Sequence, residues 1–125
     1  MNNTGKLILI VDDEPEICWV LERILKKVGG ICHLAHSAEE AISMVECHQY
    51  HMAFLDAKLP DLDGFELARC LRKSNPDLNI AMVSGYYYKA DQTILMAIQT
   101  GLISSFIAKP FIHEEILNAL NHCLR

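Results

Sequence analysis

Residues 52–60 read Met-Ala-Phe-Leu-Asp-Ala-Lys-Leu-Pro, and this stretch decides the fold that we predict. Its apolar first part is short and bounded, which is typical of a buried strand that ends at Asp56. Open α/β sheets bind ligands at the carboxyl ends of their strands. A second apolar run, residues 7–11, leads directly into the acidic run 12–14. If the two strands are parallel neighbours, their carboxylates meet at one edge, and a hard divalent cation with oxygen ligands would offset the repulsion.

The rest of the chain alternates short apolar runs with patterns of helical spacing. Strands are expected at 7–11, 31–35, 52–56, 80–84 and 103–108. Helices are expected at about 15–28, from the capping box Ser37-Ala38-Glu39-Glu40 onward, from Phe65 to about Ser74, at 91–100 and at 114–124. Five such βα units with short connections require a parallel sheet with helices on both faces.

Composition narrows the class of protein. With 125 residues the chain has the length of one domain, and its net charge of −5 comes without a basic stripe, so we expect no direct binding of nucleic acid. The five cysteines are odd in number and lack CxxC spacing, which favours a reducing compartment. Neither a signal peptide nor a run of membrane-spanning length is visible, so a cytoplasmic location without membrane association is expected.

Four predicted strand ends carry polar side chains: the pair Asp12-Asp13, Asp56, Ser84 and Lys109. The carboxyl ends of parallel strands share one rim, so these groups can converge there. Asp56 could attack phosphorus as the nucleophile of an aspartyl-phosphate reaction, and the acidic pair could hold Mg²⁺. Ser84 could donate a hydrogen bond to a phosphoryl oxygen, and Lys109 could form an ion pair with Asp56 and then with the phosphoryl group.

The motifs at 11–15 (Val-Asp-Asp-Glu-Pro), 56–64 (Asp-Ala-Lys-Leu-Pro-Asp-Leu-Asp-Gly), 83–86 (Val-Ser-Gly-Tyr) and 108–111 (Ala-Lys-Pro-Phe) occur in this order on successive strand ends. In this respect the chain resembles the CheY-like receiver domains of two-component response regulators over essentially its whole length. The resemblance implies a flavodoxin-like, doubly wound five-stranded parallel sheet with strand order 2-1-3-4-5. It also implies a single receiver domain over 1–125, structured from about 7 to 124, with no output domain in this chain.

The resemblance assigns a role to each residue at the acidic edge. Asp56 would accept a phosphoryl group from a histidine kinase or a histidine phosphotransfer protein. Mg²⁺ would be held by Asp13 and Asp56 directly, by Asp12 through water, and by the backbone carbonyl of Lys58. The domain would thus be a signalling module that catalyses only its own phosphorylation and dephosphorylation.

The resemblance also assigns the residues of a switch. Ser84 would be the switch hydroxyl, Lys109 the phosphate-contacting lysine, and Phe106 the aromatic residue that turns inward on activation. The Lys109–Pro110 bond would be cis, which X-Pro bonds permit at low cost. Phosphorylation would alter the surface formed by the helix at 91–100, the strand at 103–108 and the helix at 114–124, which could also form a homodimer.

Several residues depart from the family pattern or lack a core position. Lys58 and Tyr86 could hinder the attacking water, so we hypothesise slow loss of the phosphoryl group. Ser84 and Lys109 are a few residues further apart than the family leads us to expect, which leaves the register of the helix at 91–100 open. Trp19, Tyr86, Tyr87 and Met96 are candidate partner contacts; packing of Trp19 against the last helix and a packed tyrosine loop are the alternatives.

Other functions remain as alternatives. An aspartyl-phosphate phosphatase would need an acid two residues after the nucleophile, where this chain has Lys58. A flavodoxin-like FMN-binding protein would need a phosphate-binding loop after the first strand, and the acidic run 12–14 would repel it. A phosphate-independent interaction domain of degenerate receiver type is the alternative that the sequence leaves open.

Overall fold

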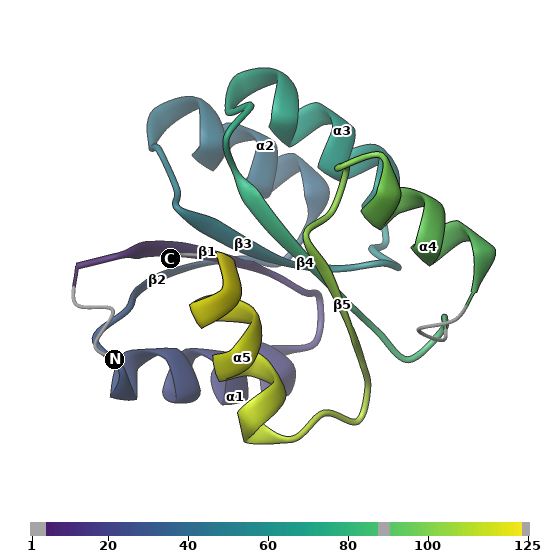
Figure 1. The fold of residues 1–125 in the computed structure, drawn as a ribbon. Helices are drawn as coiled ribbons and strands as arrows, with labels where there is room; N and C mark the ends of the chain where they lie inside the picture. The colour runs from purple at the N-terminus through teal and green to yellow at the C-terminus, as the bar shows by residue number, and fades with distance from the viewer. Residues whose placement is uncertain (1–4, 88–90, 124–125) are drawn as a thin grey trace.

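The computed structural model describes residues 5–87 and 91–123. Its elements alternate along the chain (Figure 1) as β1 (Leu7–Val11), α1 (Pro15–Lys27), β2 (Ile31–Ala35), α2 (Ala38–Cys47), β3 (Met52–Asp56), α3 (Gly64–Ser74), β4 (Asn79–Ser84), α4 (Gln92–Gln99), β5 (Ser105–Ala108) and α5 (His113–Cys123). In this part of the chain, no helix is both long and apolar enough to cross a membrane.

The five strands form one parallel sheet in the order β2-β1-β3-β4-β5, which confirms the predicted strand order. The register brings the strand ends together. Val11 of β1 pairs with Leu55 of β3, so Asp12, directly after β1, and Asp56, the last residue of β3, are neighbours at the strand ends. Further along the same edge, Ser84 of β4 pairs with Ala108 of β5, directly before Lys109.

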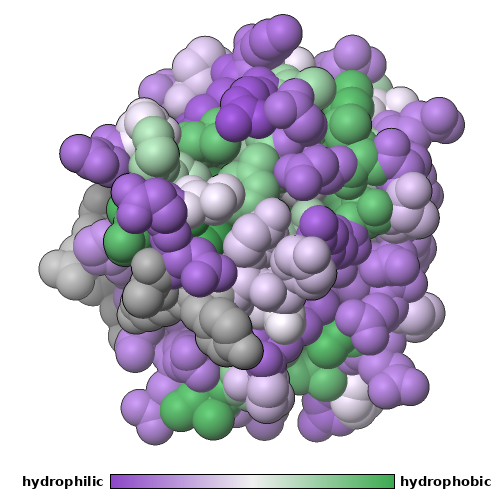
Figure 2. Space-filling model, turned by 90° about the vertical axis from the view of Figure 1, so that its right-hand side faces the viewer, coloured by the Kyte–Doolittle hydropathy of each residue, from purple (hydrophilic) through white to green (hydrophobic). Residues whose placement is uncertain are grey.

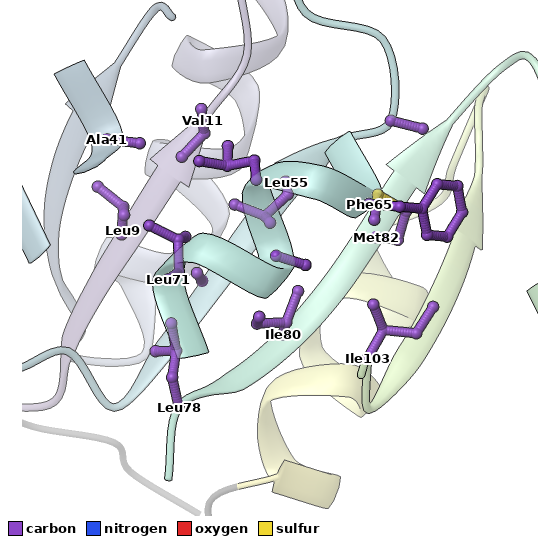
Figure 3. Close-up of a cluster of buried hydrophobic side chains, with 14 of the residues drawn as sticks. Leu9, Val11, Ala41, Leu55, Phe65, Leu71, Leu78, Ile80, Met82 and Ile103 are labelled. Carbon is purple, nitrogen blue, oxygen red and sulfur yellow. The ribbon is translucent and has the colours of Figure 1, made fainter. Parts of the chain in front are cut away.

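Helices cover both faces of the sheet (Figure 1): α2, α3 and α4 lie on one side, and α1 and α5 on the other. Figure 3 shows the larger core cluster, in which side chains of β1, β3 and β4 meet those of α2 and α3. All five residues of β3 are buried, as expected for a central strand that is covered on both faces. The central strand β3 therefore places Asp56 at the carboxyl edge of a sheet that is packed on both faces.

Two helices end at a glycine with positive φ. Gly29 follows α1 with φ 89°, next to the helix end predicted at about residue 28, and Gly101 follows α4 with φ 80°. Leu102 then donates its N–H to the carbonyl of Ala97 at 2.9 Å and Gly101 donates to that of Ile98 at 3.1 Å, a Schellman ending. This ending defines α4 as a helix of eight residues.

The observed bounds differ from the predicted ones most at β5, which begins at Ser105 rather than at Ile103. Ile103 donates its N–H to the carbonyl of Ala97 of α4 at 3.2 Å, so it still belongs to the end of that helix.

The capping box at the start of α2 also differs from the predicted arrangement. Ser37 Oγ accepts the N–H of Glu40 as predicted, but the Glu40 side chain reaches back to the N–H of His36 at 2.8 Å. Asp61, from the loop after β3, accepts the first two amides of α2 at 2.9 and 3.0 Å.

Candidate functional site

Three carboxylates meet at the carboxyl edge of β1 and β3. Asp12, Asp13 and Asp56 each offer an oxygen within 4.8 Å of the others. Asp12 and Asp56 are 1% and 7% exposed, whereas Asp13 is exposed to solvent. The cluster is thus closed on the protein side and open on one side, where an ion or substrate can enter.

Lys109 brings a positive charge to this cluster from the end of β5. Its Nζ lies 3.1 Å from Asp12 Oδ2, 3.2 Å from Glu14 Oε1 and 3.7 Å from Asp56 Oδ2. The predicted ion pair with Asp56 is therefore present, but two other carboxylates are nearer. The Lys109–Pro110 peptide bond is cis. The sequence reasoning missed Glu14 as a partner of the lysine, although its place directly after Asp13 could have indicated it.

Backbone groups fix the orientation of the two buried carboxylates. The N–H of Glu14 donates to Asp12 Oδ1 at 2.9 Å, and the N–H of Lys58 donates to Asp56 Oδ1 at 3.2 Å. At the start of α3, Gly64 lies so close that a Cβ there would be 2.5 Å from the carbonyl oxygen of Asp56. Glycine is required at this position because any side chain would push the helix away from the end of β3.

The electrostatics of the cluster reflect its burial. Burial raises the pKa of Asp56 to about 6, and the nearby charge of Asp12 adds to the effect, while the hydrogen bond from Lys58 and the charge of Lys109 lower it. Burial also raises the pKa of Asp12. Burial by itself would lower the pKa of Lys109, but the carboxylates of Asp12 and Asp56 outweigh it and raise that pKa. Lys109 therefore stays charged, while the carboxylates favour any added cation.

The predicted switch residues lie next to this cluster. Ser84 is 1% exposed, and its Oγ accepts the N–H of Tyr86 at 2.9 Å. Because a hydroxyl that accepts one bond still has a hydrogen to donate, Ser84 can also bond an oxygen in the cleft. Phe106 is 6% exposed, so its ring already lies inward in this structure.

The mouth of the cleft is lined by Asp13, Glu14, Asp56, Lys58, Ser84, Gly85, Tyr86 and Lys109. Lys58 is exposed there, and its Nζ lies 4.1 Å from the ring centroid of Tyr86 and 5.9 Å from that of Tyr87. The side chain therefore makes a cation–π contact across the cleft from the loop after β3 to the loop after β4. Tyr88, the third tyrosine of the triplet, lies outside the described residues.

Two candidate partner contacts lie away from the cleft. Trp19 is 57% exposed on α1 and stacks with Arg23, whose guanidinium carbon lies 4.8 Å from the ring centroid. It also borders a groove with Phe111 and His113, so part of its ring faces the start of α5. Met96 is 53% exposed, and Leu95 beside it 48%. Figure 2, which views the side on which α4 lies, shows hydrophobic patches between hydrophilic side chains. A partner on either surface remains a prediction.

The three carboxylates suit a hard divalent cation. Among His, Cys, Asp and Glu in the described residues, Asp12, Asp13 and Asp56 are the one group of three whose ligand atoms come close enough for a shared ion. All the ligands are oxygens, as Mg²⁺ and Ca²⁺ prefer, and no imidazole or thiolate is present to favour zinc. The residues present therefore fit Mg²⁺.

The fold and the site together define a doubly wound α/β domain with a carboxylate and lysine cluster at the carboxyl edge of its sheet, suited to phosphoryl chemistry. The family model described as the response regulator receiver domain matches residues 8–121. The chain therefore belongs to the family of response regulator receiver domains.

Solved structures agree with this assignment. A CheY-like response regulator receiver domain from Methanospirillum hungatei is 30% identical, with a TM-score of 0.84, and the match covers 94% of this chain and 91% of that one. The response regulator TrrA from Thermotoga maritima, solved in complex with Mg²⁺ and BeF, is 28% identical with a TM-score of 0.83, and the match covers 95% and 99%.

Among curated proteins, the nitrogen assimilation regulatory protein NtrX from Azorhizobium caulinodans is 35% identical over 112 residues. The match covers 88% of this chain but 24% of NtrX. Other curated relatives are longer too: the chain spans 50% of the response regulator MprA from Mycobacterium ulcerans. The similarity therefore concerns the receiver part of these relatives.

Proposed function

We propose that Asp56 is the phosphoacceptor of this receiver domain and that its phosphorylation depends on Mg²⁺. The observation that carries the proposal is the position of Asp56: its carboxylate lies at the end of the central strand, between two acidic neighbours and 3.7 Å from Lys109 Nζ. A histidine kinase or a histidine phosphotransfer protein would be the donor in the cell, and acetyl phosphate can serve as a donor in the test tube.

In the proposed reaction, an oxygen of the Asp56 carboxylate forms a bond to phosphorus, and the bond from phosphorus to the donor breaks. The donor leaves with the electron pair of that bond, as acetate when acetyl phosphate is used. The Lys58 amide keeps Asp56 Oδ1 in place at 3.2 Å, so Oδ2 is the oxygen directed to the cleft and the lysine. Burial of Asp56 limits access of water to the acyl phosphate that forms.

Asp12, Asp13, Asp56 and the backbone carbonyl of Lys58 would hold Mg²⁺. The ion would supply charge neutralisation for the phosphoryl oxygens. Lys109, freed from part of its contact with Asp56, would pair with one phosphoryl oxygen, and Ser84 would donate its hydroxyl hydrogen to another. These contacts exist only after phosphorylation, so they can bias a two-state surface that includes Phe106, α4, β5 and α5.

The test is incubation with acetyl phosphate and Mg²⁺, read by intact mass, with Asp56→Asn as the control. One added phosphoryl group that requires both Mg²⁺ and Asp56 is the expected result. If no adduct forms and beryllofluoride also fails to bind, the proposal is wrong, and the phosphate-independent interaction domain becomes the better description.

A further inference from the structure

The loop that joins β3 to α3 carries one proposed Mg²⁺ ligand, the backbone carbonyl of Lys58. Both ends of this loop are closely held. Lys58 and Asp63 form an isolated antiparallel bridge, and the N–H of Gly64 donates to the carbonyl of Ala57 at 2.9 Å. Asp63 also caps α3 with its side chain. The loop is therefore a closed turn that moves as one unit, and its tip consists of residues 59–62.

One carboxylate joins the tip of this loop to a neighbouring helix by two hydrogen bonds. Asp61 Oδ1 accepts the N–H of Ala38 at 2.9 Å, and Oδ2 accepts that of Glu39 at 3.0 Å. These are the first two amides of α2, which lies beside α3 on the same face of the sheet (Figure 1). The two bonds lower the pKa of Asp61, and a helix N-terminus favours a negative charge, so the carboxylate is ionised at neutral pH. The connection is thus bidentate and charge-assisted.

Helix α2 also has a cap of the ordinary local kind. Ser37, directly before the helix, accepts the N–H of Glu40 at 3.2 Å, and the Glu40 side chain accepts the N–H of His36 at 2.8 Å. The first amides of a helix lack partners inside the helix, and a side chain from the preceding turn usually bonds one of them. Here two of these amides are bonded by a residue more than twenty positions along the chain. The additional carboxylate therefore fixes the position of the loop as well as capping the helix.

We propose that Asp61 is a positioning residue for the Mg²⁺ site, which holds the loop tip on α2 so that the Lys58 carbonyl stays at the acidic edge. The inference rests on the proposed function and deepens it by naming a residue that influences the affinity for the metal without contacting it. The N–H of Lys58 donates to Asp56 Oδ1 at 3.2 Å, and three residues later Asp61 is bonded to α2. Loss of the second restraint would leave the loop more conformations to lose when the ion binds. Because coupling between two sites is reciprocal, bound Mg²⁺ would in turn order the start of α2.

The test is the dissociation constant for Mg²⁺, measured by isothermal titration calorimetry on the unphosphorylated protein in about 0.15 M salt, which screens exposed charges. Asp61→Ala should raise this constant about tenfold, the low end for loss of an outer contact of a metal site, because the carboxylate ligands are untouched. Asp61→Asn, whose side-chain oxygen can still accept one amide, should raise it about threefold. If urea denaturation shows that Asp61→Ala does not fold, Asp61→Asn carries the comparison.

Two matched variants separate positioning from helix capping and from charge. Ser37→Ala removes the local cap of the same helix but lies outside the loop. Glu39→Gln removes an exposed negative charge from the first turn of α2. Both should leave the dissociation constant within about twofold of the wild-type value. A second readout is hydrogen exchange by NMR: saturating Mg²⁺ should slow exchange of the Ala38 and Glu39 amides in the wild type but not in Asp61→Ala.

The outcomes separate this inference from the proposed function. If the wild type shows no Mg²⁺ binding that depends on Asp56, the proposed metal site fails and the inference fails with it. If the wild type binds Mg²⁺ and accepts the phosphoryl group but Asp61→Ala binds the ion equally well, the positioning role is overturned while the proposed function stands. The role is also overturned if Ser37→Ala or Glu39→Gln weakens binding as much as Asp61→Ala, since helix capping or charge alone then accounts for the effect. Amides of α2 that exchange equally fast with and without Mg²⁺ in the wild type would overturn it as well.

Discussion

Replacement of Asp56 by asparagine should stabilise the metal-free protein. The carboxylate is 7% exposed and lies beside Asp12 and Asp13, and its pKa is raised to about 6, mainly by burial. In the unfolded chain an aspartate has a pKa of about 3.9. The folded state therefore holds the proton more tightly, so the charge of Asp56 opposes folding whenever the pH is high enough to ionise it.

The magnitude follows from the two pKa values. A difference of about two pKa units, at about 1.4 kcal/mol each, gives up to about 3 kcal/mol. Asparagine can still accept the Lys58 amide through its side-chain oxygen, so Asp56→Asn should raise the free energy of unfolding by about 2–3 kcal/mol at pH 8. The gain should be complete above pH 6, shrink as the pH falls through the range between 6 and 4, and vanish below the unfolded pKa.

Urea denaturation of both proteins in EDTA at pH 8 and pH 4 measures this difference, and thermal melting should show a rise of about 6–9 °C at pH 8. Asp77→Asn is the matched control, because Asp77 is exposed in the loop before β4, at the opposite edge of the sheet. Saturating Mg²⁺ should stabilise the wild type more than the variant. An Asp56→Asn protein that is no more stable than the wild type at pH 8, or whose gain persists at pH 4, would refute the reasoning.

Three further changes test other parts of the structure. Lys58→Asn combined with Tyr86→Ala should shorten the lifetime of the phosphoryl group by opening the cleft to water, as loss of the phosphorylated mass over time would show; an unchanged lifetime would count against this hypothesis. Arg72→Met should lower the free energy of unfolding by about 2–3 kcal/mol in urea, because its guanidinium donates to three backbone carbonyls, whereas Arg69→Met on the surface should change little. Gly64→Ala should lower the free energy of unfolding by about 1–3 kcal/mol, since the new Cβ would lie 2.5 Å from a backbone oxygen at the end of β3. A variant as stable as the wild type would mean that α3 can shift away from β3 at no cost.

The fold could be predicted from the sequence because apolar residues occur in short continuous runs in its strands and recur at helical spacing in its helices. The strand at 52–56 and the end of α1 near residue 28 depend on local rules, and both were predicted correctly. The start of β5 was predicted two residues too early because Ile103 is apolar and buried in either case. Only the hydrogen bond to Ala97 shows that this residue completes the end of α4.

Which residues line the site could also be inferred, since residues at the carboxyl ends of parallel strands share one edge of the sheet. Which of their side chains contact each other could not be inferred. Which carboxylate lies nearest to Lys109, and that Glu14 is among them, depends on side-chain conformations that no spacing rule fixes. Long-range contacts were missed for the same reason: Asp61 accepts amides of α2 from a loop more than twenty residues away. Lys58 was singled out by its position, but its contact with Tyr86 required the structure.

The balance of charge in the cleft connects these points to the proposed reaction. Asp12, Asp13, Glu14 and Asp56 contribute four negative charges when ionised, and Lys58 and Lys109 contribute two positive ones, which leaves a net charge of −2. A phosphoryl group would add nearly two more negative charges in place of that of Asp56. Two lysines cannot neutralise this excess in a partly buried site, so a bound divalent cation would favour the proposed transfer. The two lysines are placed differently: Lys109 pairs with the acids inside the cleft, whereas the ammonium of Lys58 lies over the Tyr86 ring at the mouth of the cleft.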